Sequence, residues 1–392
     1  MAETKNFMAK LVRAWPALPY MALGALLASV YIASSGTAWL SDSEINGGNL
    51  SVLTVTMSLS AGGLIISSVP KAFGIAGFGG ISKVAVFSSI ACTVCAIGLV
   101  VVDMGQPFRV WELFVYSNMG SPLMWDIIVL ATYLILSCVY LWAQLRAERG
   151  QMSAVALRVI SVVALVCAVL VHSVTAWIFG LQQGHEMWHT ALLAPWFVSS
   201  ALVCGTALVM AVVIGLRAAG YLALDQANVV KLAKLLGAFV LVDLYFFGCD
   251  LLTEAFPGGA GAEVVAMLVS GPLAPFFWVE VVGCAACAVI CLTPSLRRNG
   301  LLVAASLLAI AGIFCKRVQL LVGGFQIANL DLPFAMNSMS VTNWEGTLTE
   351  AYAGMVYWPT PLEFGVTLGV VALGCLIFFL GLKFLPLRPS DQ

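Results

Sequence analysis

Charged residues and histidines are scarce in this chain of 392 residues: 9% are Asp, Glu, Lys or Arg, and three are His. Soluble domains carry about 25% charged residues, so the composition excludes a soluble globular fold. In their place the chain has long apolar runs, and 61% of its residues are hydrophobic. Runs of about 20 such residues can each cross a bilayer as a helix. The sequence therefore predicts an all-α integral membrane protein, with residues 1–392 in a single polytopic domain.

Several classes of site lack the residues they need. No phosphate loop, dinucleotide fingerprint or zinc motif occurs in a usable context, and no basic face is available for nucleic acid. His172, His185 and His189 are too few for the paired axial ligands of two membrane haems, although they leave a single haem open. The eleven cysteines lie mostly singly in apolar runs, where they act as small hydrophobic residues. We therefore expect no metal site, haem or iron–sulfur cluster within this chain.

Hydropathy and turn signals predict about ten transmembrane helices with both termini cytoplasmic. We expect two four-helix bundles, over 40–180 and 189–322, and two peripheral spans; the first apolar run lacks a cleavage site and is expected to be retained. A long extracytoplasmic segment, 323–358, precedes the last span. A Pro-Leu pair followed by Trp and an acid opens both the fourth and the eighth span, which reflects either an internal repeat or chance. The expected spans are 17–39, 51–70, 82–102, 123–146, 157–180, 189–216, 231–253, 264–292, 300–322 and 360–385.

The distribution of basic residues supports this topology. Cytoplasmic segments of membrane proteins carry an excess of Lys and Arg. With ten spans and a cytoplasmic N-terminus, all but three of the 18 Lys and Arg residues fall on that side, the exceptions being Arg109, Lys316 and Arg317. Most acidic residues lie in spans or on the outer face, so we expect a reaction or a partner there.

Two acids stand at the outer membrane edge, in the stretch DMGQPFRVWELFVYSNMGSPLMWD. Asp103 ends the third expected span and Asp126 lies about one turn into the fourth, so the helical hairpin brings both to the same side of the bilayer. An ionisable group at that depth is costly unless it is paired or hydrated, which makes each acid a candidate functional residue. Helix capping or an ion pair with Arg109 is the alternative explanation.

Further polar groups lie inside the expected spans. His172, in the fifth span, can donate and accept hydrogen bonds, as a quinone contact or a proton relay requires, but a hydrogen bond between helices would explain it as well. Three acids recur on one face of the seventh span and a fourth follows in the eighth. They either form a proton path or are neutralised by Lys316 and Arg317. The candidate path comprises Asp243, Asp250, Glu280 and Arg317.

Together these passages resemble a known family. VVDMGQPFRVWELFVYSNMGSPLMWD is similar to the hairpin of NrfD/PsrC-like polysulfide reductase membrane subunits, where a D/H-x-G-R-P element ends one span and an S-P-x-x-W-D element begins the next. HSVTAWIF, MWHTALLAPWFVSSALVCGTALVM, GPLAPFFW and YWPTPLEFGV resemble other parts of its ten-span branch. That branch includes membrane subunits of alternative complex III, the quinone reductase complex, and the Dsr and Hyb complexes. One departure is Gln106, which stands where the family has Arg.

The resemblance implies a quinone-reactive anchor that exchanges electrons between menaquinol or menaquinone and an extracytoplasmic iron–sulfur subunit, commonly with a molybdopterin or cytochrome subunit. By position, Asp103 and Asp126 match family acids associated with quinone and proton handling. His172 is a further catalytic candidate, and Arg109 has to replace the Arg that is missing at Gln106. The expected quinone contacts are Arg109, Trp125, Tyr133, His189 and Glu363.

Two functions stay open on the sequence alone. The first is the quinone-reactive anchor of a respiratory complex in the cytoplasmic membrane, with outer loops facing the periplasm or exterior and with proton translocation as an addition. In that case Asp126 is the preferred proton acceptor. The second is a secondary transporter of ten spans without a redox role, which an eighth span interrupted by Pro and Gly would also suit.

Overall fold

The computed structural model describes residues 18–19, 21–23, 63–74, 79–103, 107–182, 187–326 and 361–387. Within these ranges the regular structure is helical, and eight helices are long and apolar enough to cross a membrane. The all-α membrane fold predicted from the sequence is confirmed. The elements are α4 (Gly79–Asp103), η2 (Pro107–Arg109), α5 (Glu112–Val115), α6 (Pro122–Glu148), α7 (Ala154–Gly180), α8 (Leu193–Ala218), α9 (Gln226–Ala255), α10 (Ala260–Val269), α11 (Ala274–Leu292), η3 (Pro294–Leu296), α12 (Asn299–Gln326) and α14 (Pro361–Phe384).

The beginning of the chain and the long segment before the last span fall mostly outside the described residues. Of the first two expected spans, 17–39 and 51–70, the structure describes a few residues and a short apolar helix, Gly63–Phe73. The expected segment 323–358 is described only as far as Gln326, where α12 ends. These expectations therefore stay predictions.

The eighth expected span, 264–292, is divided into two helices. α10 ends at Val269, and α11 begins at Ala274. Pro272 lies in the break and Pro275 in the first turn of α11, and proline has no backbone N–H to continue a helix through such a point. α10 follows Gly258 and Gly259, both at positive φ (76° and 65°), which glycine adopts without strain. The interruption by Pro and Gly that the sequence indicates in the eighth span is thus observed, and the range predicted as one span comprises two helices.

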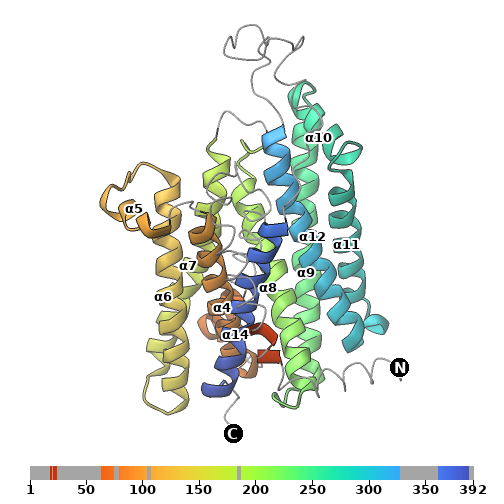
Figure 1. Ribbon diagram of the computed structural model, residues 1–392. Coiled ribbons are helices and arrows are strands. Elements are labelled where there is room, and N and C mark those ends of the chain that lie inside the picture. The colour runs from red at the N-terminus through yellow and green to blue at the C-terminus, as the bar shows by residue number, and fades with distance from the viewer. Residues whose placement is uncertain are drawn as a thin grey trace.

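The long helices form two groups that meet at α8. α4, α6 and α7, which we call bundle one, pack in the order α4–α6–α7, with α14 against α4. α8, α9, α11 and α12, which we call bundle two, pack against one another, and α8 also contacts α7 and α4. Figure 1 shows α6 and α11 at opposite sides of the molecule, with α8 and α12 between them.

Contacts between helix ends define two ends of the molecule. Lys83, near the start of α4, forms an ion pair with Glu148 at the end of α6 (2.8 Å) and donates to the carbonyl of Pro386 after α14 (3.0 Å). Tyr221, just after α8, donates to the carbonyl of Leu382 in α14 (2.9 Å). We call this the basic end, and the opposite end, where α5 lies, the hairpin end (Figure 1).

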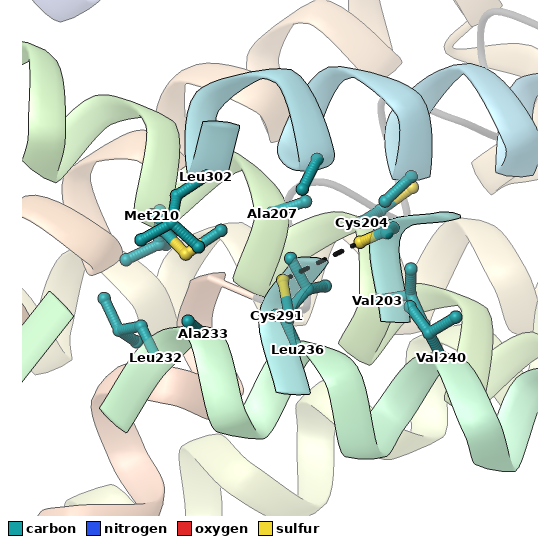
Figure 2. Packing of buried hydrophobic residues seen from close by; sticks show 14 of the residues in the cluster. Val203, Cys204, Ala207, Met210, Leu232, Ala233, Leu236, Val240, Cys291 and Leu302 are labelled. Atoms are coloured by element: carbon teal, nitrogen blue, oxygen red, sulfur yellow. Dashed lines mark hydrogen bonds between the residues drawn. The ribbon is translucent and has the colours of Figure 1, made fainter. Parts of the chain in front are cut away.

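The core of bundle two is apolar and closely packed. Figure 2 shows side chains of α8, α9, α11 and α12 meeting, and many of them are small. Small side chains let helix backbones approach closely, which favours helix association inside a membrane. Among the buried residues of this core are Val203, Cys204, Ala207, Met210, Leu232, Ala233, Leu236, Val240, Cys291 and Leu302.

Close packing of α14 on α4 depends on glycine and generates a stability prediction. A methyl group at Gly381 would overlap the Phe87 ring of α4, which stacks on Phe378. We expect Gly381→Ala to lower the free energy of unfolding by about 1–3 kcal/mol, as overpacking typically does. Thermal unfolding of the purified protein measures this, with Gly248→Ala as control because a Cβ there meets nothing within 4 Å. Equal melting temperatures for the two variants would contradict the prediction.

Candidate functional site

Asp126 is a buried carboxyl group one turn inside the hairpin end of α6. Its residue is 9% exposed, and its Oδ1 lies 2.5 Å from the hydroxyl oxygen of Thr175 on α7. α6 begins with Pro122 directly after Ser121, which sets the depth of Asp126 in the helix. The two helices pack side by side, so this pair sits between them and away from open water. The predicted burial of Asp126 inside a span is confirmed.

The hydrogen bonds of Thr175 bear on the proton of Asp126. The Thr175 hydroxyl is also 2.7 Å from the carbonyl of Val171, one turn earlier on α7. A hydroxyl group has one proton to donate, so it cannot donate to both acceptors at once. Both contacts are satisfied together when Asp126 carries a proton and donates to Thr175, while Thr175 donates to Val171. The geometry therefore suits a carboxyl group that takes up and releases a proton.

The other residues of the hairpin lie nearer the surface. Arg109 forms an ion pair with Glu112 (2.7 Å), and this contact raises the pKa of its guanidinium. Trp125 is partly exposed and donates its indole N–H to the carbonyl of Met119 (2.7 Å), which ties the hairpin to the start of α6. Asp103 is the last residue of α4, and its side chain lies outside the described part of the structure. Whether Arg109 can also reach Asp103 stays a prediction.

An open hollow of about 540 Å³ lies between α5 and the start of α6. Its volume is in the range of small-molecule sites, about 300–1,000 Å³. Met124 and Ile127 of α6 line it on one side and Arg109 lines the other. It thus ends next to the turn of α6 that carries Asp126.

His172 lies one turn before Thr175 on α7 and is fully buried, with its Nε2 lacking a hydrogen-bond partner among the described residues. Arg317 of α12 is close enough for the charges of the two groups to interact. Arg317 donates to the hydroxyl of Ser200 (2.6 Å) and stacks on Phe197 (3.6 Å to the ring centroid). His172 therefore faces the boundary between the bundles.

Bundle two holds a buried ion pair in its hairpin-end half. Lys316 of α12 donates to both oxygens of Asp243 (2.9 and 3.0 Å), and the hydroxyl of Ser199 donates to one of them (2.6 Å). Lys316 also lies over the Trp196 ring, 3.8 Å from its centroid. Asp243, for which the sequence left a proton path or an ion pair open, is thus held in an ion pair by three hydrogen bonds.

The remaining acids of bundle two surround a small cavity of about 30 Å³, large enough for ordered water. Asp250 and Glu254 line it from α9, and Glu280 lines it from α11 beside Lys316. Glu280 accepts a hydrogen bond from Gln319 (2.9 Å). The structure therefore brings the predicted path residues Asp250 and Glu280 to one cavity, although it does not test proton transfer through them.

For two of the residues expected to contact the quinone, the described part of the structure shows no contact with Asp126. His189 is exposed, and its ring Nδ1 lies 3.2 Å from the carbonyl of Gly180 at the end of α7. Glu363 lies in the first turn of α14, but its side chain is outside the described part. His185 also falls outside the described residues.

The sequence reasoning missed a line of buried polar residues along α6, which we call the α6 polar face. These residues are spaced by seven, four, three and four positions, which places them on one face of a helix, so the pattern was visible in the sequence. All of them are buried, although buried positions of a membrane helix can be purely apolar without cost. The α6 polar face consists of Asp126, Tyr133, Ser137, Tyr140 and Gln144.

Each member of this face has a polar neighbour. The hydroxyl of Tyr133, an expected quinone contact, lies 2.6 Å from the Ser89 hydroxyl of α4, two turns from Asp126. Tyr140 donates to the carbonyl of Ser67 (3.0 Å) in the short apolar helix. The amide of Gln144 donates to the Ser67 hydroxyl (3.2 Å). Tyr133 is thus part of this polar line.

Comparison with known proteins gives a consistent picture. Residues 52–329 match the family model described as polysulphide reductase, NrfD. A protein of Halobacterium salinarum, provisionally named as a membrane subunit of dimethyl sulfoxide reductase, is 33% identical, over 85% of this chain and 81% of its own length. The integral membrane subunit of the Hdr-like menaquinol oxidoreductase of Archaeoglobus fulgidus is 26% identical (85% and 82%). A selenate reductase subunit of Mesobacillus selenatarsenatis is 24% identical (84% and 83%).

Removing one member of the buried ion pair should be costly. We expect Lys316→Met to lower the free energy of unfolding by about 3–5 kcal/mol, because the buried Asp243 charge loses its counter-ion. Lys316→Met combined with Asp243→Asn should recover much of this loss, and Lys234→Met, at an exposed position of α9, serves as control. Thermal unfolding measures all three, and a double variant as unstable as Lys316→Met would argue against the pairing.

Proposed function

This chain belongs to the polysulphide reductase NrfD family, and we propose that it is the quinone-reactive membrane subunit of a respiratory oxidoreductase complex. The observation that carries the proposal is the buried Asp126–Thr175 pair at the hairpin end. A hollow of ligand size is lined by Met124 and Ile127 of the same turn of α6, although not by Asp126 itself. Relatives that carry the names of menaquinol, selenate and dimethyl sulfoxide oxidoreductase subunits support it. We propose menaquinol or menaquinone as the substrate.

The chemistry of a quinol matches the groups near Asp126. Oxidation releases two electrons and two protons, so the site needs a contact for the hydroxyl oxygen and a group that accepts a proton. Asp126 supplies the proton acceptor, and Thr175 holds its carboxyl in place. His172, with a buried ring nitrogen available, is the second group suited to contact a quinone oxygen. The ring would approach through the hollow between α5 and α6.

We propose that the electrons pass to an acceptor outside this chain, as the family resemblance implies. We propose that an extracytoplasmic iron–sulfur subunit docks at the hairpin end, with a molybdopterin or cytochrome subunit beyond it. In this arrangement the chain lies in the cytoplasmic membrane with the basic end facing the cytoplasm, as the excess of Lys and Arg there favours.

A transporter role is the second candidate, and the broken passage from α10 to α11 is the observation in its favour. Helices interrupted within the membrane commonly build substrate sites in transporters. In this chain, however, Lys316 of α12 is paired with Asp243 of α9. The cavity beside this pair is only about the size of a water molecule, too small for a substrate. Membership of a family of redox subunits favours the anchor.

Replacement of the Asp126 carboxyl tests the proposed chemistry. We expect Asp126→Asn to lower the quinol oxidation rate of the purified complex at least about 100-fold, the range in which a general base contributes. Thr175→Val, which keeps the carboxyl but removes its hydroxyl partner, should have a smaller effect. The control is Asp225→Asn, the same change at an exposed position before α9. Unimpaired turnover in Asp126→Asn would refute the role of Asp126.

The partner proposal has a separate test. Affinity purification of this chain from mild detergent should bring down an iron–sulfur protein, detected by its iron content and by mass spectrometry. Substitution of Trp111 and Phe114, exposed aromatic residues at the hairpin end, by Ser should weaken this association, whereas Trp142→Ser, at an exposed position towards the basic end of α6, should not. An isolated chain that transports solutes in liposomes would instead support the transporter.

A further inference from the structure

We propose that the α6 polar face and its partners form a proton path that connects Asp126 with the basic end of the molecule. The inference rests on the proposed function, because it concerns the protons that quinol and quinone exchange at Asp126. It assigns the path to bundle one, whereas the sequence had pointed to the acids of bundle two. The two bundles differ in whether polar groups extend along their whole length.

The outer part of the path begins at Asp126. Tyr133 lies seven residues further along α6, about 10 Å away along the helix axis. Side chains of a helix lean towards its N-terminus, so the Tyr133 ring leans back towards Asp126. On α4, Thr93 lies one turn from Ser89, on the Asp126 side of the contact between Ser89 and Tyr133, and is buried. The proposed path requires one or two ordered water molecules to bridge the remaining separation.

The inner part of the path contains a hydrogen-bond network around Tyr140. Ser137 lies between Tyr133 and Tyr140 on the same face of α6 and donates to the carbonyl of Tyr133 in its own helix (2.8 Å), so its hydroxyl has to rotate to join Tyr133 to this network. Beyond Tyr140, the hydroxyls of Ser67 and Ser82 are 2.6 Å apart. Each hydroxyl can both donate and accept a hydrogen bond, which proton transfer along such a line requires.

At the basic end the network ends close to an ion pair that is in contact with solvent. Ser82 donates to the amide oxygen of Gln144 (3.0 Å), whose amide nitrogen donates to Ser67 (3.2 Å). The next residues on the same helices, Lys83 of α4 and Glu148 of α6, form the ion pair at this end, and the Glu148 side chain is 35% exposed. Polar groups therefore extend from Asp126 to the surface along the full length of α6.

Bundle two lacks such continuity among its described residues. Its buried charged residues lie in the hairpin-end half, around Lys316 and the small cavity. Towards the basic end its core consists largely of hydrophobic side chains (Figure 2). The buried hydroxyl of Ser306 in this half donates to the carbonyl of Leu302 in its own helix (2.9 Å). The cavity of bundle two is therefore closed towards the basic end by an apolar core.

A path of this kind determines the side on which protons appear. Each quinol oxidised gives two electrons to the acceptor at the hairpin end and releases two protons, which the path delivers to the basic end. In the reverse reaction, electrons from the hairpin end and protons from the basic end meet at the quinone. Electrons and protons then reach the site from opposite sides of the membrane, so turnover moves charge across it.

Vesicles with the purified complex and a trapped pH indicator test the proposal. Ferricyanide, which does not cross the membrane, is added outside with a menaquinol analogue, so only complexes with the hairpin end outward react. Two ferricyanides become ferrocyanide for each quinol oxidised, and this reduction consumes no protons. Valinomycin with potassium removes the opposing membrane potential, and vesicles without the complex give the uncatalysed rate. We expect acidification of the lumen, abolished by a protonophore.

Variants separate a proton path from hydrogen bonds that only hold the helices together. Tyr140→Phe, which removes one oxygen atom, should lower the rate of lumen acidification at least tenfold, with quinol binding and melting temperature close to those of the unaltered complex. Thr132→Val, a hydroxyl removed from the exposed face of the same helix, should change neither. For Tyr140→Phe, a lower melting temperature with unchanged acidification would show a purely structural role and overturn the proposal.

The results also distinguish this inference from the proposed function. Quinol turnover with proton release only outside the vesicles would overturn the path and leave the quinone-reactive role intact. Absence of quinol turnover and of quinol binding in the complete complex would overturn both. Lumen acidification that is lost in Tyr140→Phe but kept in Glu280→Gln would support the path through bundle one.

Discussion

A polar group buried among apolar helices must find a partner, because the membrane interior offers no water to replace one. Two sets of buried polar groups in the described helices meet this requirement in different ways. In bundle two, charges neutralise each other, and Asp243 is held by Lys316 and Ser199. In bundle one, neutral hydroxyl and amide groups pair along α6, and Asp126 is the carboxyl group at the hairpin end of that line. Everything proposed for the function follows from this difference.

The difference assigns separate roles to the two bundles. Asp243 makes two short contacts to an ammonium group and one to a hydroxyl, an arrangement that suits a structural ion pair. Asp126 has instead a neutral hydroxyl partner that can accept or donate. His172 of α7 and Arg317 of α12 are both buried. We therefore propose that bundle two is held by fixed charges and that exchangeable protons belong to bundle one.

Much of this fold could be predicted from the sequence, because long apolar runs leave helices as the only economical structure. The depth of Asp126 followed from Pro122 and the span edge. Pro and Gly indicated an interruption in the eighth span, because Pro272 lacks a backbone donor, but hydropathy did not give the ends of the two helices at Val269 and Ala274. Which side chains pair between helices could not be predicted from the sequence, because residues such as Thr175 and Asp126 are 49 positions apart. The buried tyrosines of α6 were visible as a pattern, but only their partners show what they form.

If the proposed function is correct, Asp126 takes up a proton from the quinol. Infrared difference spectra of the complex, recorded between the oxidised and the reduced quinone, measure this directly through the C=O stretch of a protonated carboxyl group. We expect a carboxyl band that changes with the redox state of the quinone, shifts on exchange into D₂O and is missing in Asp126→Asn. The same band, unchanged in Asp126→Asn, would show that another group takes the proton.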